Sequence, residues 1–415
     1  MTSRTRFQFR LRFTAIAFAI LSALVIGAAQ TALAQTYSVI HTFSGSDGID
    51  PTSTLVQDRA GNFYGTTESG GSSGGSAGAG VLFQLKRAGS GWIFVPLHDF
   101  GQPVSYGTMP LNYGGLTFGP DGILYGSASY GGLLDCGQSY CGVVFRLQPP
   151  ATACRSALCP WDYSLMYQFT NVEYPEGNVV FDTAGNLYGT TEFGGVYEIS
   201  PSNGGWTESL IGAADGEING GMVIDGAGNL YGVWGEGYQT KGGVFELSPT
   251  SSGWTETVLY SFTGGSDGAL PVGGLIFDNA GNLYGSTSTG GIEGGGTLFE
   301  LLPSGSGWTF KLLWSLPGSA NSGPQSALTM DSQGDLYGTT VHGGAHGGGS
   351  VFKGTRIGNN WVVNDLYDFQ QGSNGVFPVA GVTLDSQGNL YGTTSSGGNT
   401  DACYDGCGVI WEITP

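Results

Sequence analysis

Short apolar runs separated by glycine-rich turns recur from residue 37 to the end of the chain. In one stretch, the run 254–262 (WTETVLYSF) alternates apolar and polar residues, which is the pattern of a half-buried β-strand. Two further apolar runs, 274–278 and 283–288, flank the turn sequence DNAGN, and a fourth run at 297–301 follows a glycine-rich loop. The stretch therefore predicts four short strands joined by turns.

The four-strand pattern is written seven times. Each copy contains Gly-x-Leu-Tyr-Gly, with Phe in place of Leu in the first copy. The tyrosines of the copies are Tyr64, Tyr125, Tyr188, Tyr231, Tyr284, Tyr337 and Tyr391. No apolar stripe of helical period follows residue 34, so helix is expected to be nearly absent. Four-stranded repeats of about 50 residues are typical of radial arrays. The prediction is an all-β fold, a seven-bladed β-propeller of four-stranded blades.

The turn ahead of each tyrosine has its own chemistry. Six copies open this turn with an aspartate, and a glycine follows three residues later. The carboxylate can accept hydrogen bonds from backbone N–H groups of the turn, and the glycine supplies a positive φ. In the second copy Gly119 takes the aspartate position and Asp121 follows two residues later. The glycine after each tyrosine is expected to clear space for an aromatic ring of a neighbouring blade.

Both ends of the repeat region carry incomplete units. Residues 37–43 (YSVIHTF) match the first strand of a unit, and the chain finishes at a fourth strand, 409–413. If each blade combines strands two, three and four of one unit with strand one of the next, the N-terminal strand completes the last blade and closes the ring. Blades built from strands one to four in order are the alternative. In the first arrangement, two kinds of loop share one face of the disc, here called the loop face. These are the loops between strands one and two of a unit (one-to-two loops) and between strands three and four (three-to-four loops).

The first 34 residues have the pattern of a signal peptide. Four arginines precede an uncharged apolar run at 13–29, and Ala32-Leu33-Ala34 matches the small-x-small cleavage pattern. An uncleaved membrane anchor is the alternative. We expect cleavage near Ala34, a single propeller domain at 35–415, and secretion to the cell exterior or the periplasm.

Charge narrows the choice of partners. Without residues 1–34 the chain holds nine basic and 32 acidic residues, a net charge of −23. Such a surface repels nucleic-acid phosphates and anionic lipid headgroups, so neither nucleic acid nor, once the signal peptide is removed, a membrane is expected as a partner. A glycan or a protein is the expected ligand, bound by a monomer.

The six cysteines form three near-neighbour pairs. An even number in an exported chain indicates disulfides, and the spacings, with no histidine nearby, disfavour zinc. Opposite faces of a blade lie about 17–20 Å apart, whereas the Cα atoms of a disulfide lie within about 7 Å. Each pair is therefore expected to close locally. The pairs are Cys136/Cys141, Cys154/Cys159 and Cys403/Cys407.

The repeated sequence GNLYGTT, followed by Gly-Gly, a Gly-Val-Phe-Glu-Leu strand and a Trp, resembles the GloVer tandem-repeat family of exported bacterial proteins. The clearest copies are 185–199, 281–301 and 388–413, and the resemblance covers nearly all of 37–415. Members of that family usually carry a C-terminal surface anchor. None is recognisable here, so release is expected. The order of Tyr, Gly-Gly and Trp is also similar to that of kelch propellers. These resemblances imply a propeller fold and no established activity.

Carboxylates are the strongest candidates for catalytic groups. Glu68 and Glu192 follow a Thr-Thr pair at the end of strand three, on the loop face. Two carboxyl groups about 5–10 Å apart carry out glycoside hydrolysis, so a secreted carbohydrate-active hydrolase or lyase is one hypothesis. Solvated loop charges are the alternative. Calcium at the aspartate turns is a further alternative, although these turns lack the dense oxygen spacing of an EF-type loop. No other cofactor is expected.

A binding module is the first hypothesis, because a rigid disc presents Gly, Ser, Thr and aromatic residues on one face without a catalytic constellation. Exposed aromatic rings beside hydroxyls and carboxylates suit glycans. Trp234 and Tyr130 are the expected ring contacts, and Asp47 and Asp267, in the one-to-two turns, are the expected polar contacts. A structural scaffold without a small ligand is the third hypothesis.

Overall fold

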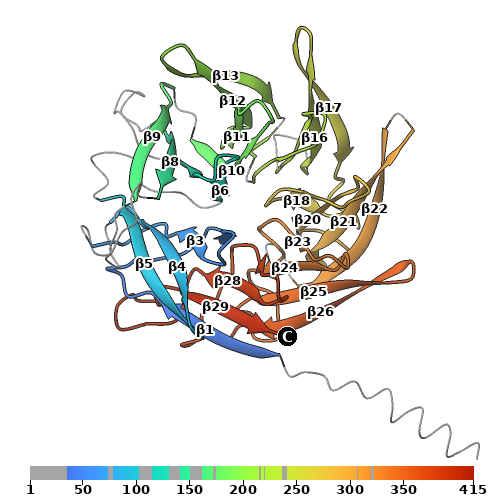
Figure 1. The fold of residues 1–415 in the computed structure, drawn as a ribbon. Coiled ribbons are helices and arrows are strands. Elements are labelled where there is room, and N and C mark those ends of the chain that lie inside the picture. The colour runs from blue at the N-terminus through green and yellow to red at the C-terminus, as the bar shows by residue number, and fades with distance from the viewer. Residues whose placement is uncertain are drawn as a thin grey trace, which may run out of the picture. The chain divides into compact units, whose positions relative to one another are not determined.

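The predicted fold class is confirmed by a computed structural model, which forms one unit between Tyr37 and Thr414. The seven antiparallel sheets are arranged as a seven-bladed β-propeller, and no helix occurs in the part of the chain that is described (Figure 1). The described residues are 35–72, 78–101, 115–129, 141–149, 161–171, 174–214, 216–218, 220–235, 241–305, 307–318 and 322–415. In these ranges no helix is long and apolar enough to cross a membrane. The expected signal peptide, residues 1–34, lies outside them, so its cleavage stays a prediction.

Each blade has four strand positions, of which the innermost faces the centre of the ring (Figure 1). The innermost strands are β2 (Val56–Gln57), β6 (Thr117–Phe118), β10 (Pro175–Phe181), β14 (Val223–Ile224), β19 (Ile276–Phe277), β23 (Thr329–Met330) and β27 (Thr383–Leu384). The second strands are β3 (Phe63–Thr66), β7 (Leu124–Ala128), β11 (Leu187–Thr191), β15 (Leu230–Trp234), β20 (Leu283–Thr289), β24 (Leu336–Thr340) and β28 (Leu390–Thr394). In the fifth blade an additional short strand, β18 (Ala269–Pro271), also pairs with β20.

The two outer positions hold the longer strands. The third strands are β4 (Val81–Ala88), β8 (Val143–Gln148), β12 (Gly195–Ser202), β16 (Gly243–Thr250), β21 (Gly294–Ser304), β25 (Ser350–Ile357) and β29 (Val409–Thr414). The outermost strands are β5 (Gly91–Asp99), β9 (Asp162–Gln168), β13 (Gly205–Ala213), β17 (Gly253–Ser261), β22 (Gly307–Pro317), β26 (Asn360–Asp368) and, in the seventh blade, β1 (Thr36–Thr42).

The ring closes by the first of the two arrangements considered. The sheet order β1-β29-β28-β27 places the N-terminal strand outermost in the seventh blade, beside the C-terminal strand. Tyr37 of β1 stacks on Tyr367 of the sixth blade, with ring centroids 3.8 Å apart. His41 of β1 stacks on Phe94 of the first blade, with centroids 4.1 Å apart. The N-terminal strand therefore also packs against both neighbours of the blade that it completes.

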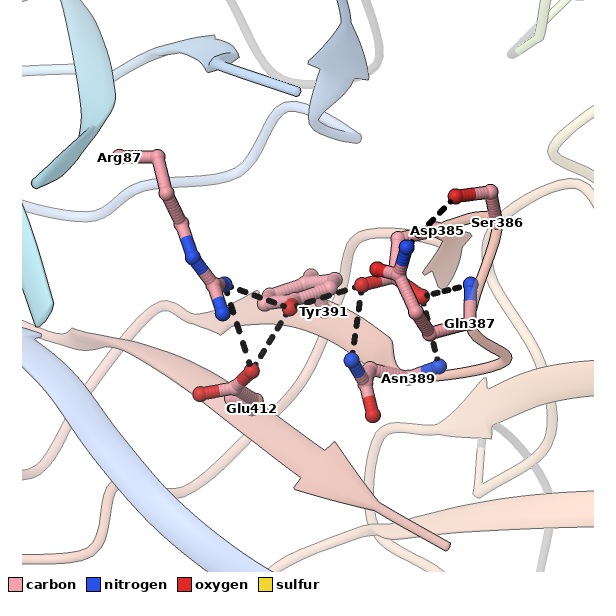
Figure 2. Close-up of polar contacts among 7 residues, drawn as sticks. All are labelled: Arg87, Asp385, Ser386, Gln387, Asn389, Tyr391 and Glu412. Atoms are coloured by element: carbon pink, nitrogen blue, oxygen red, sulfur yellow. Dashed lines mark hydrogen bonds and ion pairs between the residues drawn. The ribbon is translucent and has the colours of Figure 1, made fainter. Parts of the chain in front are cut away.

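A carboxylate holds the hairpin between the innermost and second strands. In the seventh blade, Asp385 Oδ1 accepts hydrogen bonds from the backbone N–H groups of Gln387 and Asn389, both at 2.9 Å. Its Oδ2 accepts from Asn389 Nδ2 at 2.8 Å and from the Tyr391 hydroxyl at 3.2 Å (Figure 2). Burial and the nearby carboxylates Glu412 and Asp385 raise the pKa of Tyr391, so the phenol keeps the proton that it donates.

The bond from the tyrosine hydroxyl to this carboxylate recurs in every blade. Its length is 2.8–3.2 Å in the pairs Asp58/Tyr64, Asp121/Tyr125, Asp182/Tyr188, Asp225/Tyr231, Asp278/Tyr284 and Asp331/Tyr337. In the second blade Asp121 replaces the missing aspartate and also accepts from the N–H of Ile123 at 3.0 Å. The shifted acid of that copy therefore preserves the contact.

The glycine after each tyrosine makes room for an aromatic ring, but that ring belongs to the same blade. A Cβ atom on Gly65 would lie 2.6 Å from Phe83 Cζ, and Phe83 is its cross-strand partner on β4. The expectation of a ring from a neighbouring blade is therefore wrong, because the cross-strand side chain already covers the glycine. Contacts between blades come from the tyrosine itself, since Tyr64 of the first blade packs in one cluster with Leu124 and Phe145 of the second.

The loop face is assembled as expected. Ile49 of a one-to-two loop and Ser69 of a three-to-four loop exchange backbone hydrogen bonds at 2.8 and 3.1 Å. On this face the predicted disulfide between Cys403 and Cys407 is confirmed, with Cα atoms 5.3 Å apart. Cys141 is also disulfide-bonded. The other three cysteines lie outside the described residues, so their pairings stay predictions: Cys136, Cys154 and Cys159.

Replacing Asp278 with Ala is expected to lower the free energy of unfolding by about 2–4 kcal/mol, because four donors lose one charged acceptor. These donors are the N–H groups of Ala280 and Asn282, Asn282 Nδ2 and the Tyr284 hydroxyl. Denaturant unfolding measures the change. Asp401→Ala, at an exposed loop position, is the control and is expected to change stability by less than about 0.5 kcal/mol. Equal effects of both changes would contradict the role given to the hairpin carboxylate.

Removing residues 1–43 is expected to destabilise the ring strongly, because β29 then becomes an unpaired edge strand. Removing only residues 1–34 is the control, since β1 remains. A synthetic peptide of residues 35–44, added to the shorter protein, is expected to restore part of the lost thermal stability. Equal melting temperatures for the two truncated proteins would show that β1 does not close the ring.

Candidate functional site

A cavity of about 290 Å³ lies at the centre of the ring, lined by residues from all seven blades. Most of its wall is glycine, alanine or aliphatic, and its polar side chains are those of Thr52, Thr54, Asn178, Gln325 and Ser326. These side chains carry hydroxyl or amide groups and no charge. The wall is therefore suited to hydrogen bonding and apolar contact with a narrow group.

The third blade departs from the repeat at the loop-face end of its innermost strand, β10. In five blades a proline stands just before the innermost strand or at its start. The residue after this proline is Glu176 in the third blade, whereas in the other four blades it is neutral: Thr52, Val272, Gln325 and Val379. Three of these four residues line the cavity. Glu176 therefore places a carboxyl group at the register position where other blades place a neutral side chain.

Glu176 is buried without a hydrogen-bond partner for one of its oxygens. Its side chain is 8% exposed, and Oε2 is buried and unpaired. Burial, together with the negative charges of Glu192 and Glu217, raises the pKa of Glu176 to about 7. We call these three glutamates the acid site. Glu192 is half-buried and Glu217 is exposed, so the acid site extends from the buried start of β10 to the surface of the loop face.

The backbone around Glu176 is fixed by both neighbouring blades. Ser129 of the second blade donates to the carbonyl of Pro175 at 2.9 Å. Thr190 Oγ1 lies 2.8 Å from the carbonyl oxygen of Glu176 and 3.1 Å from that of Gly220 in the fourth blade. Gly177 has φ 71°, and a Cβ atom there would lie 2.7 Å from the backbone of Gly220. The carboxyl group thus stands on a rigid segment.

An aromatic pair borders the acid site. The rings of Tyr174 and Phe193 lie 5.8 Å apart, and the Phe193 side chain is 63% exposed. These residues are chain neighbours of Pro175 and Glu192, and the Glu192 N–H donates to the carbonyl of Tyr174 at 3.0 Å. A ligand above the acid site would therefore meet an exposed ring as well as carboxyl groups.

Of the two predicted catalytic candidates, the structure places Glu192 in the acid site. Glu68 takes the equivalent position in the first blade, where its N–H donates to the carbonyl of Asp50 at 2.9 Å. Burial raises the pKa of Asp50. The first blade therefore holds a pair of acidic residues on the loop face, joined by the backbone bond that in the third blade joins Glu192 to Tyr174.

The expectation that Trp234 is an exposed ring contact is wrong. Its side chain is 2% exposed and packs in the core of its blade with Phe245. In five other blades this position is a threonine, and in the second blade it is Ala128. The Thr67 hydroxyl, for example, accepts from the N–H of Val81 on the next strand at 3.0 Å. A side chain at this position is therefore directed into the blade. Gly243, the cross-strand partner of Trp234, leaves room for the indole, because a Cβ atom on Gly243 would lie 2.3 Å from the Trp234 ring.

The two predicted polar contacts have structural partners. Asp47 accepts from the N–H of Ser44 at 2.8 Å and lies 3.1 Å from His41 Nε2. Asp267 accepts from the N–H and the hydroxyl of Thr263 at 2.8 and 2.5 Å. Both carboxylates thus hold one-to-two turns, and a binding role for them stays a prediction. Tyr130 lies outside the described residues.

The calcium hypothesis also stays a prediction. The described residues contain no group of three or more His, Cys, Asp or Glu side chains placed to hold one metal ion. At the hairpin turns the carboxylate oxygens face hydrogen-bond donors, as Asp385 does.

Sequence reasoning missed Glu176. It lies on β10, the innermost strand of its blade, whereas the candidates were chosen from loop positions. Aligning the copies that carry this proline would have found it, because the residue that follows is otherwise a threonine, an aliphatic residue or an amide. Its neighbours Glu192 and Glu217 come from two blades, and only the closed ring brings them near.

Comparison with known proteins supports the repeat and the fold. A family model described as the Gloeobacter/Verrucomicrobia repeat matches the chain at residues 29–195, 137–294 and 218–415, which together span all seven copies. No curated protein matches closely enough to suggest an activity.

Among solved structures, the chain is similar to the extracellular domain of a candidate hybrid two-component system from B. thetaiotaomicron. The identity is 13% and the TM-score 0.55, over 92% of this chain and 42% of that one. A structure described as the same domain of a one-component system has 14% identity and a TM-score of 0.53, over 91% of this chain and 42% of that one. A candidate oxidoreductase (glucose dehydrogenase) from Thermus thermophilus has 13% identity and a TM-score of 0.46, over 92% of this chain and all of that one, 100%. At these identities the similarities concern the fold alone.

The buried carboxyl group predicts a pH-dependent difference between the wild type and Glu176→Gln. The pKa of Glu176 is raised in the folded state, so the folded protein binds more protons than the unfolded chain between about pH 4.5 and 7. Stability from this group is present at low pH and is lost as the pH rises through that window. Relative to Glu176→Gln, the wild type is expected to lose about 3 kcal/mol between pH 5 and 8. Denaturant unfolding at both pH values measures this, and a constant difference would contradict the buried environment.

Proposed function

The chain belongs to the Gloeobacter/Verrucomicrobia repeat family, and on that premise we propose that its propeller is an exported binding module for a glycan. The ligand docks on the loop face over the acid site. The observation that carries the proposal is Glu176, a buried carboxyl group with an unpaired oxygen at the loop-face end of β10, the innermost strand of the third blade. Such a group destabilises the free protein and is compensated when a ligand supplies the missing partner.

The surroundings of this carboxyl group support a sugar as the ligand. When the Glu176 side chain turns toward the loop face, hydroxyl groups of a glycan can donate to its unpaired oxygen. The exposed Phe193 ring offers an apolar face for a pyranose ring. The neutral polar groups of the cavity wall, Asn178 and Gln325, add amide contacts below. The rigid ring reduces the entropy that binding would otherwise cost.

Export is supported by the disulfide chemistry. The Cys403–Cys407 bond and the bonded state of Cys141 suit an oxidising compartment, since such bonds are rare in the cytosol. The N-terminal pattern of a signal peptide agrees with this location.

A second candidate function, carbohydrate cleavage, is favoured by one specific observation. Glu176 holds its proton near neutral pH because of burial and neighbouring charge, with its pKa raised to about 7, and the more exposed Glu192 lies close enough to contribute to that shift. A protonated carboxylic acid beside a second carboxyl group is the arrangement that glycosidases use.

Binding is tested by the thermal shift of residues 35–415 against a panel of polysaccharides. A stabilising glycan is expected, and Glu176→Gln is expected to weaken its binding about tenfold. Glu293→Gln, an exposed carboxyl group in the three-to-four loop of the fifth blade, is the matched control and is expected to bind like the wild type. The absence of any stabilising glycan would overturn the proposal in favour of a protein ligand. If the wild type shortens the polymer and Glu176→Gln does not, the protein is an enzyme.

A further inference from the structure

The three buried carboxyl groups of the described residues differ in how they are compensated. Glu300, 2% exposed, pairs with Lys311 Nζ at 3.0 Å and lies 2.8 Å from the Tyr284 hydroxyl, whose proton it shares with Asp278. Asp267, 9% exposed, accepts from the N–H and hydroxyl of Thr263. Glu176 has neither kind of partner for its buried Oε2. Of these three carboxyl groups, only Glu176 therefore has a buried oxygen without a compensating group.

The charges that act on Glu176 are of one sign. Both groups that shift its pKa are carboxylates, Glu192 and Glu217. A neutral ligand would supply hydrogen bonds and leave this repulsion in place, whereas a bound cation would remove it and add charge-assisted bonds. Elsewhere in the ring the protein itself supplies such cations, as Lys353 does for Asp335 at 2.7 Å.

The cation that fits is organic. No three acidic side chains of the described residues are placed to share a metal ion. An ammonium group needs no such convergence, because its three N–H donors point in different directions and can reach separated acceptors. The ring face of Phe193, which is 63% exposed beside Glu192, attracts the same charge.

We propose that the acid site recognises glycans that carry free amino groups, with a protonated sugar amine bound between Glu176 and Glu192. This inference rests on the proposed glycan-binding function and names the ligand chemistry of that site. On binding, the Glu176 side chain turns toward the loop face and its Oε2, which is buried in the free protein, accepts a hydrogen bond from the amine. The carboxyl group then ionises and releases its proton to solvent. An N-acetylated sugar lacks the charge and presents an acyl group to three carboxyl groups, so it is rejected.

The test is calorimetry of residues 35–415 with a glucosamine oligomer of about six units and with its fully N-acetylated counterpart. At about pH 6 the sugar amine is charged and Glu176 is mostly protonated. The free-amine oligomer is expected to bind at least tenfold more tightly. Titrations in two buffers of different ionisation enthalpy are expected to show release of close to one proton per bound ligand. Proton release separates this role of Glu176 from a merely structural one.

The variants sharpen the result. Glu176→Gln is expected to abolish the proton release and the preference for the free amine while leaving the protein folded. Glu192→Gln is expected to reduce affinity for the free-amine oligomer, and Glu293→Gln is expected to change neither quantity.

Each other outcome is decisive. Equal or tighter binding of the N-acetylated oligomer overturns the inference and leaves the glycan-binding function standing. Failure of both oligomers to bind, while another polysaccharide of the panel stabilises the protein, does the same. Failure of every glycan overturns both proposals, and binding of a lysine oligomer in that case assigns the acid site to a basic peptide.

Discussion

The hydrogen bond from a tyrosine hydroxyl to the carboxylate of its own hairpin is the contact on which each blade depends. The carboxylate is already committed to the backbone N–H groups of the turn, so the bond ties the turn to the second strand and fixes the position of the ring. In the fourth blade, burial opposes ionisation of Asp225, but hydrogen bonds from Asn229 and Ala227 outweigh it and lower the pKa of that carboxyl group. The hairpin therefore keeps its charge, and Tyr231 keeps its acceptor.

From this fixed position the tyrosine also packs against the next blade, so a local turn determines how neighbouring blades meet. Tyr64 illustrates the link: its hydroxyl is held by Asp58, and its ring lies among residues of the second blade. Repetition of this contact aligns seven sheets around one centre. The last gap is closed by β1, because strand pairing with β29 joins the two ends of the ring without a covalent bond.

The sequence predicts such features well where the interacting residues are close in the chain. Asp278 and Tyr284 lie six residues apart, so their contact follows from a short motif, and the closure of the ring follows from the incomplete units at its two ends. The expectation that Trp234 is exposed fails because the side chain at the end of β15 is directed into the blade. No local sequence pattern indicates that direction. The acid site was found only in part, since Glu192 follows a visible motif whereas its proximity to Glu176 depends on packing between blades.

A ring of repeats also makes exceptions informative. Every blade contributes residues to the wall of the central cavity, and the copies share one repeat, so a structural requirement at one position of the repeat should be met in a similar way by each copy. After the proline, four other blades use Thr52, Val272, Gln325 or Val379, none of which carries a charge into a buried place. Glu176 costs stability at neutral pH where these neutral residues do not. Natural sequences accept such a cost mainly at functional positions, and the proposed ligand would compensate the buried carboxyl group that the third blade carries.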